Sequence, residues 1–321
     1  MEIKVVPKDG LLTIDPTAVD ALLQGTPCHF HSHFHHICQN IYTQRTGKTS
    51  ISDDLDDIGF GVIKNFASLN DAKKLRDSYS AMISKPSNSA NTVITPNELR
   101  EAQQSKLKTQ ITSMVLKAME NGVAELIENH LGCFFRIDHI QCIRTQHAYA
   151  PGISFRWHRD FEPMAQVHII LYLTACDEDS PATIFTTLED TRRLADLGYH
   201  FPFSVSDGRV EDINSLIPKD TLPIKLHRPL LDIGDATIFD AARIMHRGVA
   251  PAGKLRDVVV LNILPSLNPW DQELNFLGKE RLFELRNTMF TNPFELGSPN
   301  IEINHDCLGA PDWYLQSNYF A

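Results

Sequence analysis

The chain has 321 residues, of which 42% are hydrophobic and 22% are charged, as in a globular protein that buries a sizeable core. Its 30 basic and 40 acidic side chains give a net charge of −10, which argues against nucleic acid or an anionic membrane as a partner. No apolar run has the length of a membrane span, the first residues lack a signal-peptide profile, and the six cysteines are scattered. These features predict a cytoplasmic protein.

The N-terminal part is expected to be mainly helical after an irregular start. Residues 1–50 show no regular pattern but contain a His-rich patch at 28–36. Capping residues and hydrophobic spacing then predict, in chain order, a helix start at 52–58, a strand at 61–66, a helix from Ser68 or Asn70 to about Met82, a loop at 85–96 and a helix at about 97–129.

The pattern changes to short strands after Gly132. Segments rich in β-branched residues and separated by Pro, Gly or Asp lie at 137–144, 167–174, 182–185, 224–227, 236–239 and 258–264. Residues 187–223 interrupt them and read as a partly helical insertion, and helix and coil resume at Pro269. We therefore expect one α+β domain over 1–321, with helical support at 51–134, a β-sandwich or barrel core at 135–265 and a C-terminal segment at 266–321.

The residues that indicate chemistry are His158, Asp160 and His246. On an extended segment, His158 and Asp160 leave the same face of the backbone because they are two residues apart. Two imidazoles and one carboxylate on one face of a metal are the ligand set of non-haem Fe(II) oxygenases. A His-x-Asp pair alone occurs by chance, so the prediction depends on the distal His246.

Arg256 strengthens this prediction. His246 and Arg256 each lie five residues from Pro251, so a β-hairpin would make them cross-strand neighbours. A guanidinium is suited to holding the far carboxylate of a dicarboxylate that chelates the metal at its other end.

The segment Phe155-Arg-Trp-His-Arg-Asp-Phe-Glu162, with His246 and Arg256, resembles the iron- and 2-oxoglutarate-dependent dioxygenases, and is most like the phytanoyl-CoA dioxygenase and ectoine hydroxylase group. The resemblance covers about residues 55–265. It implies a double-stranded β-helix core, Fe(II), 2-oxoglutarate as co-substrate and O₂. It also implies that Arg256 binds 2-oxoglutarate with help from Phe155 and Gln146. Met164 stands where ectoine hydroxylases have a tryptophan, which argues against ectoine as the substrate.

Structural roles compete with several of these functional ones. Arg256 could form a surface salt bridge with Asp257, and the His-rich patch could bind metal, face solvent or fold over the barrel mouth. As a strand, that patch would place His29, His31, His33 and His35 on one face. His168 and Tyr172 lie on a polar face of strand 166–174, where they could contact substrate or make structural hydrogen bonds.

The sequence thus predicts a dioxygenase that hydroxylates an unactivated C–H bond of a small molecule while 2-oxoglutarate is decarboxylated to succinate. The alternatives are another outcome at the same iron (desaturation, epimerisation, cyclisation or hydroxylation of a protein side chain) and a cupin-like protein that binds without turnover. The insertion 187–223 is expected to act as a lid. The sequence indicates neither the substrate nor the oligomeric state.

Overall fold

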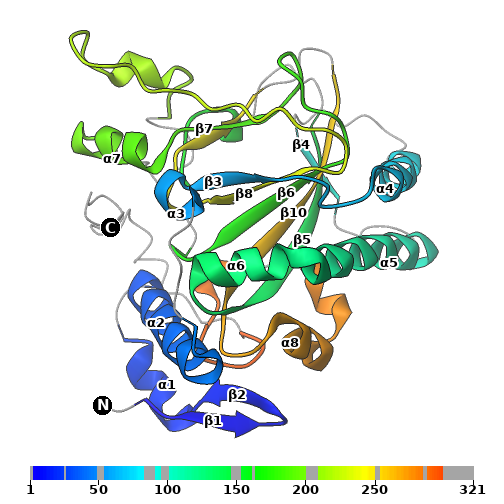
Figure 1. Ribbon diagram of the computed structural model, residues 1–321, viewed down its shortest axis with the longest axis vertical. Helices are drawn as coiled ribbons and strands as arrows, with labels where there is room; N and C mark the ends of the chain where they lie inside the picture. Colours follow the sequence, from blue (N-terminus) through cyan, green and yellow to red (C-terminus); the bar gives the residue numbers. More distant parts are fainter. Residues whose placement is uncertain are drawn as a thin grey trace.

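A six-stranded antiparallel sheet forms the centre of the molecule (Figure 1). The computed structural model describes residues 3–24, 27–48, 54–82, 91–94, 101–145, 153–160, 163–199, 209–249, 254–284 and 288–298. The strands of the large sheet lie in the order β3 (Phe60–Ile63), β8 (Ala236–Asp240), β6 (Val167–Tyr172), β10 (Arg256–Ser266), β5 (Phe134–Thr145) and β4 (Asn91–Ile94). A second sheet pairs β7 (Thr183–Phe185) with β9 (His246–Gly248). The expected mixture of helices and antiparallel strands is therefore confirmed.

The two faces of the large sheet have different environments because side chains alternate along each strand. On β6, Val167, Ile169 and Leu171 are buried in the larger hydrophobic cluster, which includes residues of the surrounding helices. Ile170 and Tyr172 belong to a second cluster on the opposite face, together with Val258 and Val260 of β10. This second face is the one that bears the candidate site.

Helices cover the first face of the sheet, where α5 (Glu101–Ala118) and α6 (Ala124–Leu131) run in front of it in Figure 1. A π-helical turn at Met119–Val123 joins them, and Gly122 takes a φ of 105° there. After residue 48, the other helices are α3 (Asp54–Ile58), α4 (Leu69–Met82), α7 (Leu188–Asp196) and α8 (Trp270–Leu277). Short 3₁₀ turns lie at Ile153–Phe155, Ile213–Leu216, Lys279–Phe283 and Thr288–Phe290. The Asp71 amide donates to Ser68 Oγ over 3.1 Å, so Ser68 is the cap of α4.

The expectation of an irregular N-terminal segment is wrong. Residues 3–48 contain β1 (Val5–Lys8), β2 (Leu11–Ile14), α1 (Pro16–Leu22) and α2 (Pro27–Thr46). The His-rich patch is part of α2, because Phe30, Phe34 and Ile37 recur at helical spacing and are buried in the core. Its histidines therefore do not share one face as they would in a strand: His29 and His33 are exposed, whereas His31 is buried.

Three further expectations need correction. Part of the predicted loop 85–96 forms the edge strand β4. Segment 224–227 contributes an isolated bridge at His227 instead of a strand. β9 pairs with β7, and β10 pairs with β5 and β6, so His246 and Arg256 are not cross-strand neighbours in a hairpin.

No helix in the described ranges is long and apolar enough to cross a bilayer. Cys38, Cys133, Cys142 and Cys176 are buried free thiols.

Candidate metal centre

The backbone fixes the relative positions of the three predicted metal ligands. The amide of His158 donates to the carbonyl of His246 over 3.0 Å, and the amide of His246 donates back to His158 over 2.8 Å. Two residues further on, the Asp160 amide donates to the carbonyl of Ala241 over 2.9 Å. The segment that carries His158 and Asp160 is thus bound to the chain on both sides of the turn that precedes β9.

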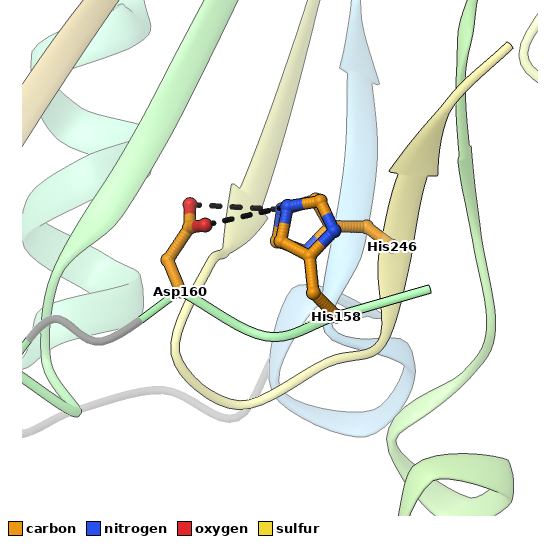
Figure 2. A group of neighbouring side chains, drawn as sticks. All are labelled: His158, Asp160 and His246. Atoms are coloured by element: carbon orange, nitrogen blue, oxygen red, sulfur yellow. Dashed lines mark ion pairs between the residues drawn. The ribbon is translucent and has the colours of Figure 1, made fainter. Parts of the chain in front are cut away.

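The side chains of these three residues converge on one point (Figure 2). His158 Nε2 lies 3.5 Å from Asp160 Oδ1, and His246 Nε2 lies 3.6 Å from Asp160 Oδ2. Their ligand atoms are all within 4.8 Å of one another, and theirs is the only such His, Cys, Asp or Glu group found in the described residues. Two imidazole nitrogens and one carboxylate oxygen at this spacing can hold one divalent transition metal.

Hydrogen bonds orient both rings for this role. His158 Nδ1 lies 2.7 Å from the carbonyl of Arg156, and His246 Nδ1 lies 3.2 Å from the carbonyl of Ile244. Each Nδ1–H donates to its carbonyl, which leaves the Nε2 lone pair directed at the shared point. An outer hydrogen bond of this kind is the usual means of fixing the tautomer of a metal-binding histidine.

The electrostatics of the cluster keep it in the form that binds metal. Burial and the neighbouring His246 ring lower the pKa of His158 to about 3, so His158 is neutral near pH 7. Burial alone would raise the pKa of Asp160, but the His246, His158 and His168 imidazoles lower it below its ordinary value, so the carboxylate is ionised. Metal binding therefore requires no proton to be removed first at these two residues.

The cluster opens into a cavity of about 360 Å³ between the large sheet and the β7–β9 sheet. Apolar side chains of β5, β6, β8 and β10 line its middle: Ile143, Ile170, Phe239, Val258 and Val260. One end is lined by Arg256 and Thr183, and the other end contains His139, Gln141 and Asn262.

Arg256 is a buried cation with no acidic partner among the described residues. Its Nη2 donates to Thr183 Oγ1 over 2.7 Å and to Tyr172 Oη over 3.2 Å, and its Nε has no partner in these ranges. Asp257, the alternative partner, faces the opposite side of β10, where it pairs with Arg144 over 2.7 Å. A buried guanidinium without a counter-charge is costly, so this arrangement fits an anionic ligand that enters the cavity.

The spacing between Arg256 and the metal ligands suits a short dicarboxylate. Thr183, which binds Arg256, is paired with Gly248 of β9, two residues from His246. Two residues along a strand correspond to about 7 Å, a distance that a five-carbon diacid can bridge.

Three of the other predicted site residues lie in or beside the cavity. Phe155 is buried in the cavity wall, and a Cβ on Gly248 would lie 3.2 Å from its ring, so Gly248 makes room for it. His168 lines the cavity, with Nδ1 at 3.6 Å from Asp160 Oδ2. Tyr172 contacts Arg256 and is not among the residues that line the cavity. Gln146 lies outside the described residues.

The sequence interpretation missed Thr183 and the polar end of the cavity. Thr183 lies in a segment that was expected to be a strand without a functional role, and His139, Gln141 and Asn262 lie on two different strands. The signals in the sequence are His139 and Gln141 at alternate positions of one strand and the single polar residue Asn262 in the apolar run 258–264.

Comparison with known proteins gave solved structures of low likeness and no sequence family. No family model matches the chain, and no curated protein does either. Among solved structures, the epimerase SnoN from nogalamycin biosynthesis, in complex with Fe³⁺, alpha ketoglutarate and nogalamycin RO, is 12% identical over 84% of this chain and 97% of its own, with a TM-score of 0.45. EctD from S. alaskensis with 2-oxoglutarate and 5-hydroxyectoine is 16% identical over 68% of this chain and 78% of its own, with a TM-score of 0.42. HygX from Streptomyces hygroscopicus, with nickel and 2-oxoglutarate, is 10% identical over 67% and 86%, with a TM-score of 0.43. At this level of likeness, the functional assignment depends on the residues of the chain itself.

Proposed function

We propose that this protein is an Fe(II)- and 2-oxoglutarate-dependent dioxygenase that hydroxylates an unactivated C–H bond of a small molecule. The observation that carries the proposal is the presence, in one cavity, of a His-Asp-His cluster and a buried arginine with no acidic partner in the described ranges. Neither feature alone is specific. Together they offer a metal site and an anchor for an anion that can chelate the metal.

His158, Asp160 and His246 would hold the iron, which when bound supplies the activation of O₂ that side chains cannot. Arg256 would bind the remote carboxylate of 2-oxoglutarate, with Thr183 and Tyr172 fixing the guanidinium. Phe155 would pack against the carbon chain, and Gln146 would add a polar contact. His168 would contact substrate or orient Asp160, whereas Tyr172 is better suited to positioning Arg256.

The surrounding residues would exclude water from this chemistry. Ile143, Ile170 and Val258 present apolar surface between the two ends of the cavity. We propose that the two sheets are the halves of a double-stranded β-helix and that the insertion 187–223, of which the structure describes 187–199 and 209–223, covers its opening. The contacts that support this are hydrogen bonds of 2.9 Å from the Trp157 amide to the Val210 carbonyl and of 3.3 Å from Tyr199 Oη to the Trp157 carbonyl.

The same site would also serve desaturation, epimerisation, cyclisation or hydroxylation of a protein side chain, because these reactions diverge only after hydrogen has been removed from the substrate. A cupin-like protein that binds metal and ligand without turnover is the candidate from another class. The cavity volume of about 360 Å³ suits a small molecule better than a folded protein as the substrate.

The test is conversion of 2-oxoglutarate to succinate by the purified protein with Fe(II) and O₂, combined with a mass-spectrometric screen of candidate substrates for the gain of one oxygen atom. Succinate that depends on Fe(II) and O₂ supports the proposal. Binding of metal and 2-oxoglutarate with no succinate for any substrate favours the binding protein.

A further inference from the structure

The end of the cavity opposite Arg256 contains a network of hydrogen bonds in which neighbouring side chains determine which groups donate and which accept. Arg256 and Asn262 lie six residues apart on β10, which corresponds to about 20 Å along the strand. At the Asn262 end, His139 of β5 and His168 of β6 are its neighbours on the two flanking strands. All three side chains are buried and line the cavity.

An irregularity in β5 places His139 beside Asp138. The register between β5 and β10 shifts at Asn262 and Ile263, so that Asp138 is an extra residue in the ladder. Adjacent strand residues normally point to opposite faces, but here His139 Nδ1 lies 3.1 Å from Asp138 Oδ2. Burial alone would raise the pKa of Asp138, but the hydrogen bond from His139 and the charges of Arg136 and Arg281 lower it to about 2. Asp138 is therefore an ionised acceptor, to which His139 Nδ1–H donates, and in the neutral imidazole Nε2 is then the acceptor.

The amides around His139 are then oriented as donors. Asn262 Nδ2 lies 2.6 Å from His139 Nε2, and Gln141 Nε2 lies 3.1 Å from the same atom. Asn262 Oδ1 accepts from Gln166 Nε2 over 3.0 Å, and Gln166 Oε1 accepts from Thr288 Oγ1 over 2.7 Å. The Gln141 side chain makes no other hydrogen bond with the described residues. Its carbonyl oxygen and second N–H, and the second N–H of Asn262, remain to bind a ligand in the cavity.

We infer that this end, formed by His139, Gln141 and Asn262, is a substrate subsite for an uncharged hydroxyl group. A hydroxyl can donate to Gln141 Oε1 and accept from the Asn262 amide. The inference rests on the proposed function, since it assumes that 2-oxoglutarate occupies the Arg256 end.

Charge balance excludes ionised groups from this subsite. Arg136 and Arg281 lie behind His139 and are paired with Asp138, so neither compensates a substrate carboxylate. The only carboxylate that lines the cavity among the described residues is Asp160, which the metal would engage, so an ammonium group has no partner there. Burying either ion without a counter-charge is far more costly than burying a hydroxyl that makes two hydrogen bonds. Ile170, Phe239 and Val260, beside the subsite, suit the carbon skeleton that carries the hydroxyl.

The test uses ligand-observed NMR on protein loaded with Zn(II), a diamagnetic substitute for iron, and saturated with 2-oxoglutarate. Three probes share one ring: cyclohexanol, cyclohexanecarboxylate and cyclohexylammonium. We expect cyclohexanol to bind and the two ions to bind at least about fivefold more weakly. In Gln141→Leu, the dissociation constant of cyclohexanol should rise about fivefold, the effect of one lost hydrogen bond. Gln272→Leu, the same substitution at an exposed position of α8, should leave it unchanged.

Equal binding of the alcohol and the ions to the wild-type protein would overturn the subsite, and this comparison does not depend on any variant folding. Unchanged cyclohexanol binding in folded Gln141→Leu would also overturn it. A calorimetric titration that detects no 2-oxoglutarate binding to the Zn(II) form would instead refute the proposed function, so the two failures are distinguishable.

Discussion

Replacement of Arg256 by leucine should weaken 2-oxoglutarate binding about 150-fold. The guanidinium is buried, and two charge-assisted hydrogen bonds to a carboxylate contribute about 1.5 kcal/mol each, or about 3 kcal/mol together. The stability of the ligand-free protein should not fall, because the substitution removes a buried cation that has no acidic partner in the described residues. The substitution should therefore lower the affinity for 2-oxoglutarate without lowering the free energy of unfolding, which is unusual for a buried residue.

Calorimetry and thermal unfolding of the Ni(II)-loaded protein measure both effects. At a 2-oxoglutarate concentration of about 100 times the wild-type Kd, the ligand should stabilise the wild type by about 2.7 kcal/mol and Arg256→Leu by only about 0.3 kcal/mol. Arg256→Lys keeps the charge but loses the forked geometry, so its affinity should lie between the two. Arg76→Leu, at a partly exposed position of α4, is the matched control. A Kd for Arg256→Leu within about threefold of the wild type would refute the assignment of Arg256 to the co-substrate.

Three other predictions concern the metal, a buried histidine and the reaction outcome. His158→Ala or His246→Ala should abolish Co(II) binding in calorimetry, while the far-UV circular dichroism spectrum stays that of the folded protein. The control His33→Ala, on the exposed side of α2, should bind Co(II) normally. Tight Co(II) binding by either site variant would contradict the proposed ligands. Burial lowers the pKa of His35 to about 4, so between pH 6.5 and 4 the unfolded chain binds a proton there that the native protein does not. The free energy of unfolding should therefore fall by up to about 1.4 kcal/mol for each pH unit as the pH is lowered through this range. Urea titrations of His35→Gln should show a dependence of this free energy on pH that is smaller by that amount, and an unchanged dependence would contradict the prediction. The Asp160 carboxylate would take a position on the metal that chloride could otherwise occupy, so turnover under labelled O₂ in chloride-rich buffer should give a hydroxylated product that contains the label. A chlorinated product would overturn the hydroxylase proposal.

The convergence of His158, Asp160 and His246 could be predicted from the sequence because two of the three lie in one short segment. His158 and Asp160 are two residues apart, and Arg256 follows His246 by ten residues, a spacing that resembles the one in the iron- and 2-oxoglutarate-dependent dioxygenases. The hairpin expected from this spacing was nevertheless wrong: His246 and Arg256 belong to different sheets that face each other across the cavity.

Features that depend on contacts between distant strands could not be predicted in this way. Asp257 pairs with Arg144 and not with Arg256, but this pairing can be predicted only if β10 is known to lie beside β5. The orientation of Gln141 depends on an irregularity in β5 that brings Asp138 to His139. The helix α2 is indicated by the spacing of the apolar residues Phe30, Phe34 and Ile37, which is obscured by the alternating histidines between them.

The most direct test of the proposed metal centre is a crystal structure of the protein with Fe(II) and 2-oxoglutarate under anaerobic conditions, with the iron located by its anomalous scattering. We predict one iron bound by His158 Nε2, His246 Nε2 and the Asp160 carboxylate, with the far carboxylate of 2-oxoglutarate on the Arg256 guanidinium. Iron bound elsewhere, for example by the exposed histidines of α2, or 2-oxoglutarate away from Arg256, would contradict this prediction.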